Sequence, residues 1–442
     1  MEGLVMTAQL LLGLAVLVTL HEFGHYVTAR MFDMRVDRFY IFFDAWGKKL
    51  FSFKKGDTEF GIGWLPIGGY VKIAGMIDES LDTEALKAEP QPWEFRSKPA
   101  WQRLIVMLGG VTVNVILGIL IFSMMTWGYG ESYLPIDQVN KHGIVALDLG
   151  KEIGFQTGDK LISINNRRLE KFKEILGAEV ILGDNVVFNV NRGGNMIDIP
   201  IPVDFAEKFT DAKGNTFIEK RHTYFIQEVF PNSNAEKGGI LPNDEILTIN
   251  GQGAKFFDQL TTIFQENKGK EVNILVSRNN REVPLNVQVG EDGKVGFASN
   301  TTDFEYAHLE YSLSESFVLG NRRAWSILYE NIKGLGKIFR GEISASKSLH
   351  GPIGIATIYG GVWDWKKFWI ITGLLSMVLA FVNILPIPAL DGGHAMFLIM
   401  EMVSGKALSD KFLERTQIAG IIILLSLMTF IIGNDIWKHI LN

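Results

Sequence analysis

Hydrophobic residues along the chain are concentrated in four long windows that contain no Asp, Glu, Lys or Arg. These windows are residues 3–20, 104–130, 368–390 and 416–434. Each is near or above the ~18–20 residues that a helix needs to cross ~30 Å of hydrocarbon. Soluble helices of this length usually keep a polar face, which these windows lack. The pattern therefore predicts a polytopic α-helical membrane protein with four transmembrane helices.

The segment between the second and third windows contains an internal repeat. Residues 152–165 match residues 237–250 at a constant offset, so that Gly154 corresponds to Gly239 and Asp159 to Asp244. Alternating apolar residues and a polar turn follow in both copies, as is typical of paired strands. We predict two copies of one small β-rich module, with chance similarity of two hairpins as the alternative.

Residues 317–340 have apolar side chains at three- and four-residue steps and basic residues elsewhere on the helical wheel. This amphipathic helix could lie on the membrane surface or pack on a neighbouring domain.

The predicted divisions of the chain are a first span (1–30), a cytoplasmic or membrane re-entrant β region (31–103), a second span (104–130), two modules (131–220 and 221–305), an amphipathic helix with its linker (306–367), a third span (368–404), and a fourth span with the tail (405–442).

Charge and composition narrow the function. The net charge is −6, so nucleic acid is not an expected partner, and the absence of cysteine excludes disulfides, thiolate metal ligands and thiol nucleophiles. Lys and Arg are concentrated in residues 30–103 and 405–415, which places both loops on the cytoplasmic side. Both termini and the repeat-containing segment are then expected on the outer side.

A His-Glu-x-x-His pattern ends the first window, formed by His21, Glu22 and His25. Residues four apart on a helix share one face, so both imidazoles can reach one ion. Imidazole nitrogens are good zinc ligands, and Glu22 could take a proton from water at the metal. Two ordinary histidines on a surface helix would give the same pattern. Burying ionisable side chains within the bilayer, however, is energetically costly, and such side chains are usually functional.

A third metal ligand is expected, because catalytic zinc sites have three protein ligands and one open position. Asp391 is the main candidate, at the end of the third window after two prolines and before Gly392 and Gly393. Prolines break the helix, and glycines allow close backbone approach. An ordinary helix N-cap is the alternative for Asp391. His394 is a rival ligand, or a group that supports one.

Together these motifs resemble those of the site-2 family of intramembrane metalloproteases. The resemblance rests on His21–His25 in a first span and on the Asn-x-x-Pro-x-Pro-x-Leu-Asp-Gly pattern of residues 383–392 in a later one. It implies zinc as cofactor, with His21, His25 and Asp391 as ligands and Glu22 as catalytic acid and base. Asn383 would help to hold an unwound substrate, and Asn114 fits the family's second span.

The resemblance also identifies the two modules as PDZ domains, which would act as a size filter, with peptide binding as the alternative. Residues 58–76 correspond to the family's membrane-associated, re-entrant β-hairpin, with Gly61, Gly63 and Pro66 as substrate-binding residues. The alternation in this segment is compatible with an edge strand, which could bind a substrate backbone by strand addition. A cytoplasmic hairpin with no such role is the alternative.

The function implied by the resemblance is hydrolysis of peptide bonds within transmembrane segments of single-pass proteins, in the bacterial inner membrane. The expected substrates are an anti-sigma factor already trimmed on its outer side and remnant signal peptides. Two other classes fit part of the pattern: a divalent-metal transporter that uses the same ligands, and a membrane-anchored PDZ scaffold. A transporter predicts further intramembrane ligands, and a scaffold leaves the histidines and Asp391 unexplained.

Overall fold

The structure is a computed structural model that describes residues 1–66, 68–76, 89–211, 217–349 and 351–438. The chain divides into two compact units. Unit 1 comprises residues 1–130, 310–339 and 344–442, and unit 2 comprises residues 131–309 and 340–343.

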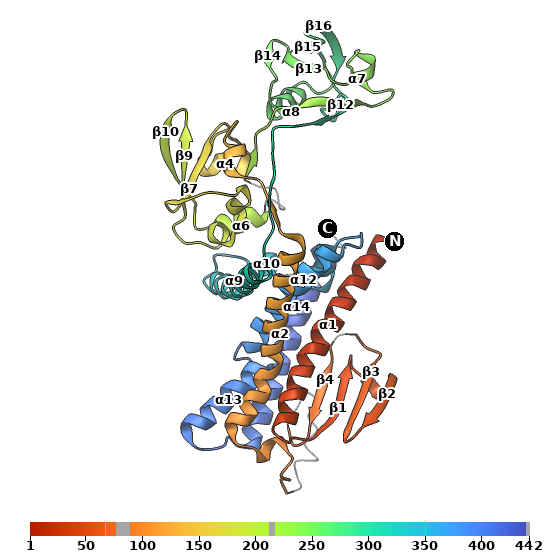
Figure 1. Ribbon diagram of the computed structural model, residues 1–442, viewed down its shortest axis with the longest axis vertical. Coiled ribbons are helices and arrows are strands. Elements are labelled where there is room, and N and C mark those ends of the chain that lie inside the picture. Colours follow the sequence, from red (N-terminus) through yellow and green to blue (C-terminus); the bar gives the residue numbers. More distant parts are fainter. Residues whose placement is uncertain (67, 77–88, 212–216, 350, 439–442) are drawn as a thin grey trace. The chain divides into compact units, whose positions relative to one another are not determined.

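Unit 1 is built around long apolar helices. Within the described residues, four helices are long and apolar enough to cross a membrane. They are α1 (Glu2–Met31), α2 (Ala100–Tyr129), α12 (Trp365–Ile384) and α14 (Asp410–Ile436). Their positions agree with the four windows in the sequence. The start of α1 and the end of α14 lie at the same end of unit 1, and α13 (Asp391–Ser404) lies at the opposite end (Figure 1).

Close packing of α1 against α2 depends on glycine. A Cβ atom on Gly24 would lie 2.6 Å from the carbonyl carbon of Gly109, and a Cβ on Gly109 would lie 2.6 Å from the Gly24 carbonyl oxygen. Small residues let apolar helices approach backbone to backbone, which is how helices gain packing energy without a hydrophobic driving force. The remaining helices of unit 1 are α9 (Leu313–Phe339), α10 (Ala345–Ser348) and α11 (Pro352–Tyr359).

A four-stranded sheet packs beside α1. Its strands are β1 (Val36–Ile41), β2 (Lys49–Lys55), β3 (Thr58–Gly63) and β4 (Tyr70–Ile73), in the order β2-β3-β1-β4. The prediction of a hairpin over residues 58–76 is wrong, because β1 lies between β3 and β4. β3 is parallel to β1 and antiparallel to β2, so it has no free edge. Alternation predicts strands but cannot reveal that an earlier strand inserts between two later ones.

Unit 2 contains two modules with separate hydrophobic cores. The strands and helices of the first are β5 (Glu131–Tyr133), α3 (Ile136–Val139), β6 (Ile144–Ala146), α4 (Asp148–Ile153), β7 (Lys160–Ile164), β8 (Arg167–Arg168), α5 (Ala178–Ile181), β9 (Val187–Arg192), β10 (Asn195–Pro200), α6 (Phe205–Asp211) and β11 (Ile218–Lys220). Those of the second are β12 (Phe225–Val229), α7 (Asn234–Lys237), β13 (Glu245–Ile249), β14 (Gln252–Gly253), α8 (Phe257–Glu266), β15 (Glu271–Arg278), β16 (Arg281–Gln288) and β17 (Phe297–Asn300), followed by β18 (Ala307–Leu309).

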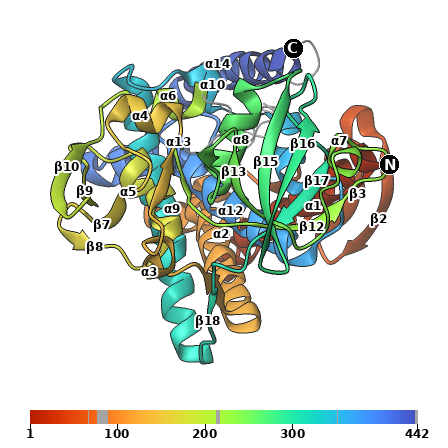
Figure 2. The ribbon, with the colours of Figure 1, turned by 90° about the horizontal axis from the view of Figure 1, so that it is seen from above.

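The two modules confirm the internal repeat. The sheet order β8-β7-β9-β10 in the first corresponds strand by strand to β14-β13-β15-β16 in the second. Figure 2 labels the four strands of the first of these sheets. A buried ion pair also recurs: Arg192 Nε contacts Asp159 Oδ1 at 2.7 Å, and Arg278 Nε contacts Asp244 Oδ1 at 2.8 Å. In each copy the arginine also donates to the carbonyl of the matching glycine, Gly154 or Gly239. The repeat is therefore one of structure as well as of sequence.

Candidate metal centre

Two histidines on α1 form the first part of the site. His21 and His25 are both buried, and their rings meet edge to face with centroids 4.9 Å apart. Their Nε2 atoms are 3.3 Å apart, so both nitrogens face the same point. The four-residue spacing predicted this shared face.

Asp391 reaches the same point from a different part of the chain. Helix α12 ends at Ile384, and the following turn contains Pro386, Pro388 and Ala389, whose φ of +81° is unusual for a residue with a side chain. This turn leads into α13, in which Asp391 is the first residue and Leu390 the N-cap. The N-cap alternative is therefore wrong. The Asp391 Oδ2 atom lies 3.2 Å from His21 Nε2 and 3.3 Å from His25 Nε2.

These three atoms have the geometry of a zinc site. In a tetrahedron with metal–ligand bonds of about 2.0–2.1 Å, ligand atoms are separated by about 3.3 Å, close to the three observed distances. Asp391 Oδ2 is buried and receives no hydrogen bond from the described residues, as expected of an atom aimed at a cation. Two imidazoles and one carboxylate are a donor set that suits zinc. The residues present therefore fit a zinc ion.

The other ring nitrogens are held by α2. His25 Nδ1 lies 2.8 Å from the carbonyl oxygen of Val106, and His21 Nδ1 lies 3.0 Å from Nδ2 of Asn114. Such partners fix the orientation of metal-binding histidines. Gly110, which lies between Val106 and Asn114 on α2, leaves room for the two imidazole rings. A Cβ atom at this position would lie 2.5 Å from His25 Nε2 and 2.6 Å from His21 Cε1.

Two further residues from the sequence prediction reach the cluster. Glu22 is half-buried and close enough to His21, His25 and Asp391 to interact with all three electrostatically. The backbone N–H of Val71 on β4 faces the Glu22 carboxylate. Asn383 Nδ2, from the end of α12, lies 3.3 Å from His21 Nε2.

Other candidate residues lie elsewhere. His394 is outside the group of three possible ligands and contacts the Gln417 side chain on α14. Gly61 and Gly63 are on β3, inside the sheet, where a Cβ would overlap the Tyr40 ring and the Phe43 backbone respectively. Packing accounts for these glycines. The edge-strand prediction for residues 58–76 is wrong for β3, whereas β4, in the same segment, lies at an edge of the sheet. Pro66 lies between β3 and β4.

Sequence reasoning missed several supporting residues, including Val106, Gly110 and Val71. The Gly109-Gly110 pair was a visible signal of close approach. A backbone carbonyl such as that of Val106 has no sequence signature, because any residue supplies one.

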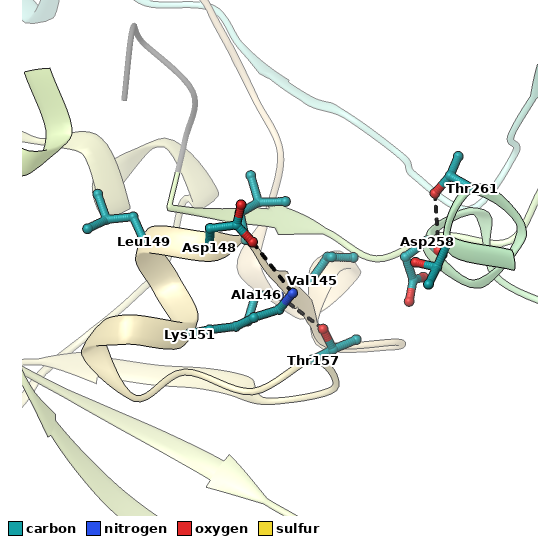
Figure 3. A pocket seen from close by; sticks show the side chains of 10 residues that line it. Val145, Ala146, Asp148, Leu149, Lys151, Thr157, Asp258 and Thr261 are labelled. Atoms are coloured by element: carbon teal, nitrogen blue, oxygen red, sulfur yellow. Dashed lines mark hydrogen bonds and ion pairs between the residues drawn. The ribbon is translucent and has the colours of Figure 1, made fainter. Parts of the chain in front are cut away.

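Unit 2 contains a cavity of about 560 Å³ with different chemistry (Figure 3). It is lined by residues of the 145–151 segment, by Thr157 and by three residues of α8. Its charged groups include Asp148 and Lys151, whose side chains are 3.8 Å apart. Within the described residues, a group of three possible metal-binding side chains occurs only at His21, His25 and Asp391. The cavity is therefore not a rival metal centre.

The fold and the site define a membrane protein whose apolar helices enclose a ligand set for a hydrolytic metal. The chain belongs to peptidase family M50, whose sequence model matches residues 9–427. It is a site-2-type, zinc-dependent metalloprotease.

Relatives extend over nearly the whole chain. The regulator of sigma E protease of Haemophilus influenzae is 29% identical over 446 residues, covering 96% of this chain and 97% of the relative. The protease RseP of Yersinia pestis is 27% identical over 456 residues, covering 97% of both. A Pasteurella multocida protein described as a zinc metalloprotease is 28% identical over 452 residues, covering 97% and 98%.

Proposed function

We propose that this protein is an intramembrane zinc endopeptidase that hydrolyses peptide bonds within transmembrane segments of single-pass membrane proteins. The observation that carries the proposal is the meeting of His21 Nε2, His25 Nε2 and Asp391 Oδ2 within 3.3 Å of one another on apolar helices. His21 and His25 lie on α1, which is long and apolar enough to span a membrane, and ionisable side chains in such helices are costly and usually functional.

The roles of the residues follow from their positions. His21, His25 and Asp391 would hold zinc, which when bound polarises the scissile carbonyl and makes water nucleophilic at neutral pH. Glu22 accepts a proton from the attacking water and delivers it to the leaving amine. Asn383 donates from Nδ2 to a carbonyl oxygen of the substrate beside the site. Both roles require a side chain close to His21, His25 and Asp391. Glu22 and Asn383 both lie there.

The substrate must unwind, because a helical carbonyl is hydrogen-bonded and shielded. An unwound segment can add to β4, which among the described strands pairs only with β1. The β4 residue Val71 faces Glu22, so a segment bound along this edge would pass beside the catalytic group. In this proposal β4 replaces β3 as the substrate-binding strand, while Pro66 lies in the connection that leads to it.

The two modules of unit 2 are assigned as PDZ domains that exclude substrates with bulky outer domains. The proposed location is the bacterial inner membrane, with both termini and unit 2 in the periplasm and the metal centre near the cytoplasmic side. The common end of α1 and α14 in unit 1 supports an even number of crossings (Figure 1). Proposed substrates are an anti-sigma factor after outer-side trimming and remnant signal peptides.

Two alternatives are less well supported. A divalent-metal transporter needs further ligands along a path, and the described residues hold one group of three. A PDZ scaffold has no use for a buried carboxylate oxygen that receives no hydrogen bond from the described chain.

The test is Glu22→Gln, with Glu2→Gln on the same helix as the matched control. Cleavage of a reporter transmembrane segment and zinc content are measured on the full-length protein. Glu22→Gln should abolish cleavage and retain zinc, whereas Glu2→Gln should behave as wild type. Cleavage by Glu22→Gln at the wild-type rate would refute the proposed acid and base.

A further inference from the structure

Arg103, near the start of α2, is a largely buried charge in an apolar helix. Its side chain is 15% exposed, and α2 is long and apolar enough to span a membrane. Burial of a charge is costly unless the charge is paired and hydrogen-bonded, and an ionisable group in such a helix is usually functional. The proposed chemistry at the metal centre gives Arg103 no role, so its contacts are the guide to what it does.

The guanidinium of Arg103 joins three segments of unit 1. Its Nη2 donates to Glu401 Oε1 of α13 at 2.5 Å, and its Nε donates to the Lys98 carbonyl oxygen at 2.9 Å. The same group lies over the ring of Phe95, with the guanidinium carbon 6.0 Å from the ring centroid. The two hydrogen bonds come from different nitrogens of one planar group, so both form at once.

The contact with Glu401 holds the helix that begins at Asp391. Glu401 is 18% exposed and lies in the last turn of α13, whose first residue is Asp391. Leu398, also on α13, belongs with Val106 of α2 to one buried cluster. The Val106 carbonyl oxygen in turn faces His25 Nδ1. Helix α2 therefore carries both a partner of His25 and the anchor of α13, and this anchor helps to set where Asp391 stands relative to the histidine.

The contacts with Lys98 and Phe95 hold the end of β4. The Phe95 backbone N–H donates to the Ala74 carbonyl oxygen at 2.8 Å, and Ala74 directly follows β4. Phe95 also belongs with Ile73, the last residue of β4, to the same buried cluster. The proposed substrate-binding strand is β4. Its position relative to α2 thus depends on the segment that Arg103 fixes.

We propose that Arg103 is a positioning residue that keeps the metal ligand Asp391 and the strand β4 in place relative to each other. This inference rests on the proposed zinc site and on β4 as the substrate-binding strand. The contact with Glu401 supports the ligand geometry and hence the zinc affinity. The contacts with Lys98 and Phe95 support the strand and hence the KM for substrate. A role limited to folding would lower the yield of folded protein without changing either constant.

The test measures both constants on the full-length, detergent-solubilised protein. Zinc affinity is obtained by competition with chelators of graded strength, and kcat and KM are obtained with a reporter transmembrane segment. Glu401→Gln removes the charge that anchors α13, so it should weaken zinc binding about tenfold, as loss of a group that supports a ligand does, with KM unchanged. Arg103→Met removes both sets of contacts and should weaken zinc binding to the same extent and also raise KM about tenfold.

Arg103→Lys separates the two sets of contacts. Lysine has one nitrogen in place of the planar fork, and the Glu401 charge attracts it more strongly than the Lys98 carbonyl does. Zinc affinity should therefore return close to the wild-type value, while KM stays raised. Arg323→Met is the matched control, because Arg323 pairs with Glu330 on its own helix, α9, at 3.2 Å. This control should match the wild type in both constants.

The outcomes separate this inference from the proposed function. Wild-type zinc affinity and KM in Arg103→Met would overturn the inference. Should Arg103→Met fail to fold, Glu401→Gln and Arg103→Lys decide: a lower yield with both constants unchanged would show a role in folding alone. Undiminished zinc in His21→Ala and Asp391→Ala would instead overturn the proposed metal site. A wild type that binds zinc but does not cleave the reporter would refute the proposed function, and the zinc affinity of Glu401→Gln would still test the contact with α13.

Discussion

His21 Nε2 and Asp391 Oδ2 lie 3.2 Å apart, although the whole of unit 2 separates them in the sequence. The contact exists only when the turn after α12 packs against the last third of α1. The metal centre therefore forms only when the apolar helices pack together. Variants that disturb helix packing near the site should lose zinc together with activity.

Gly110→Ala should inactivate the protein although alanine favours helix. The added Cβ would lie 2.5 Å from His25 Nε2 and 2.6 Å from His21 Cε1 and would push both rings out of line. A displacement of about 1 Å costs about 100-fold in rate. Reporter cleavage and zinc content are the measurements. Gly128→Ala, near the end of the same helix, is the control because its Cβ has no described atom within 4 Å. Normal zinc content in Gly110→Ala would contradict the packing argument.

Val71→Pro tests the backbone N–H of Val71 on β4, which faces the Glu22 carboxylate. Proline lacks this N–H, and edge strands tolerate proline where the N–H does not pair with a neighbouring strand. Loss of the hydrogen bond to the Glu22 carboxylate should reduce kcat/KM about tenfold, with zinc affinity unchanged. Val71→Ala retains the N–H and should cleave as wild type does. If Val71→Pro cleaves equally well, this N–H does not support the proposed role of Glu22.

Arg278→Met should destabilise the second module selectively. The carboxylate of Asp244 is 1% exposed and would lose both Arg278 hydrogen bonds, of 2.8 and 2.6 Å. Removing one partner of a buried pair costs about 3 kcal/mol. Hydrogen exchange of residues 245–288 against urea concentration measures the change, with the exposed neighbour Arg281→Met as control. The first module has its own core and should not change. A loss of stability shared by both modules would show that they unfold together.

Glu174 should make the first module sensitive to acid. Burial raises the pKa of this carboxyl, but hydrogen bonds from Arg167 Nη1 (2.5 Å) and the Lys171 backbone N–H (2.9 Å) outweigh it and lower the pKa below its ordinary value. A lowered pKa in the folded state gives stability that is complete above the unfolded pKa of about 4.3 and is lost as pH falls through the folded value.

The variant Glu174→Gln should therefore lose about 0.5–1 kcal/mol at pH 7, as expected for a partly exposed pair. The difference in unfolding free energy between this variant and the wild type should disappear at low pH, where the wild-type carboxyl is protonated in both the folded and the unfolded state. Urea-dependent hydrogen exchange of residues 160–200 at several pH values follows this change, with the exposed Glu170→Gln as control. A difference that persists unchanged at low pH would point to a steric origin.

Much of the fold could be predicted from the sequence, because it depends on local sequence patterns. Charge-free windows predict the spans, since hydrocarbon imposes a length on any apolar helix. Spacing predicts the shared face of His21 and His25, since the helical turn fixes it. The repeat predicts the equal topology of the two modules. By contrast, the position of β1 between β3 and β4 was missed, because strand order depends on which partner a strand meets after the chain folds back.

The sequence by itself determined which residue types are available for chemistry: two imidazoles, a carboxylate between them and an aspartate after a proline-rich turn, all on or beside apolar helices. Tertiary structure alone decided that Asp391 points at the histidines instead of capping α13, that a Val106 carbonyl and the Asn114 amide hold the rings, and that β4 lies at an edge of its sheet. The physical reason is that coordination and hydrogen bonding require distances of about 3 Å between atoms. Only the packing of separate helices sets those distances.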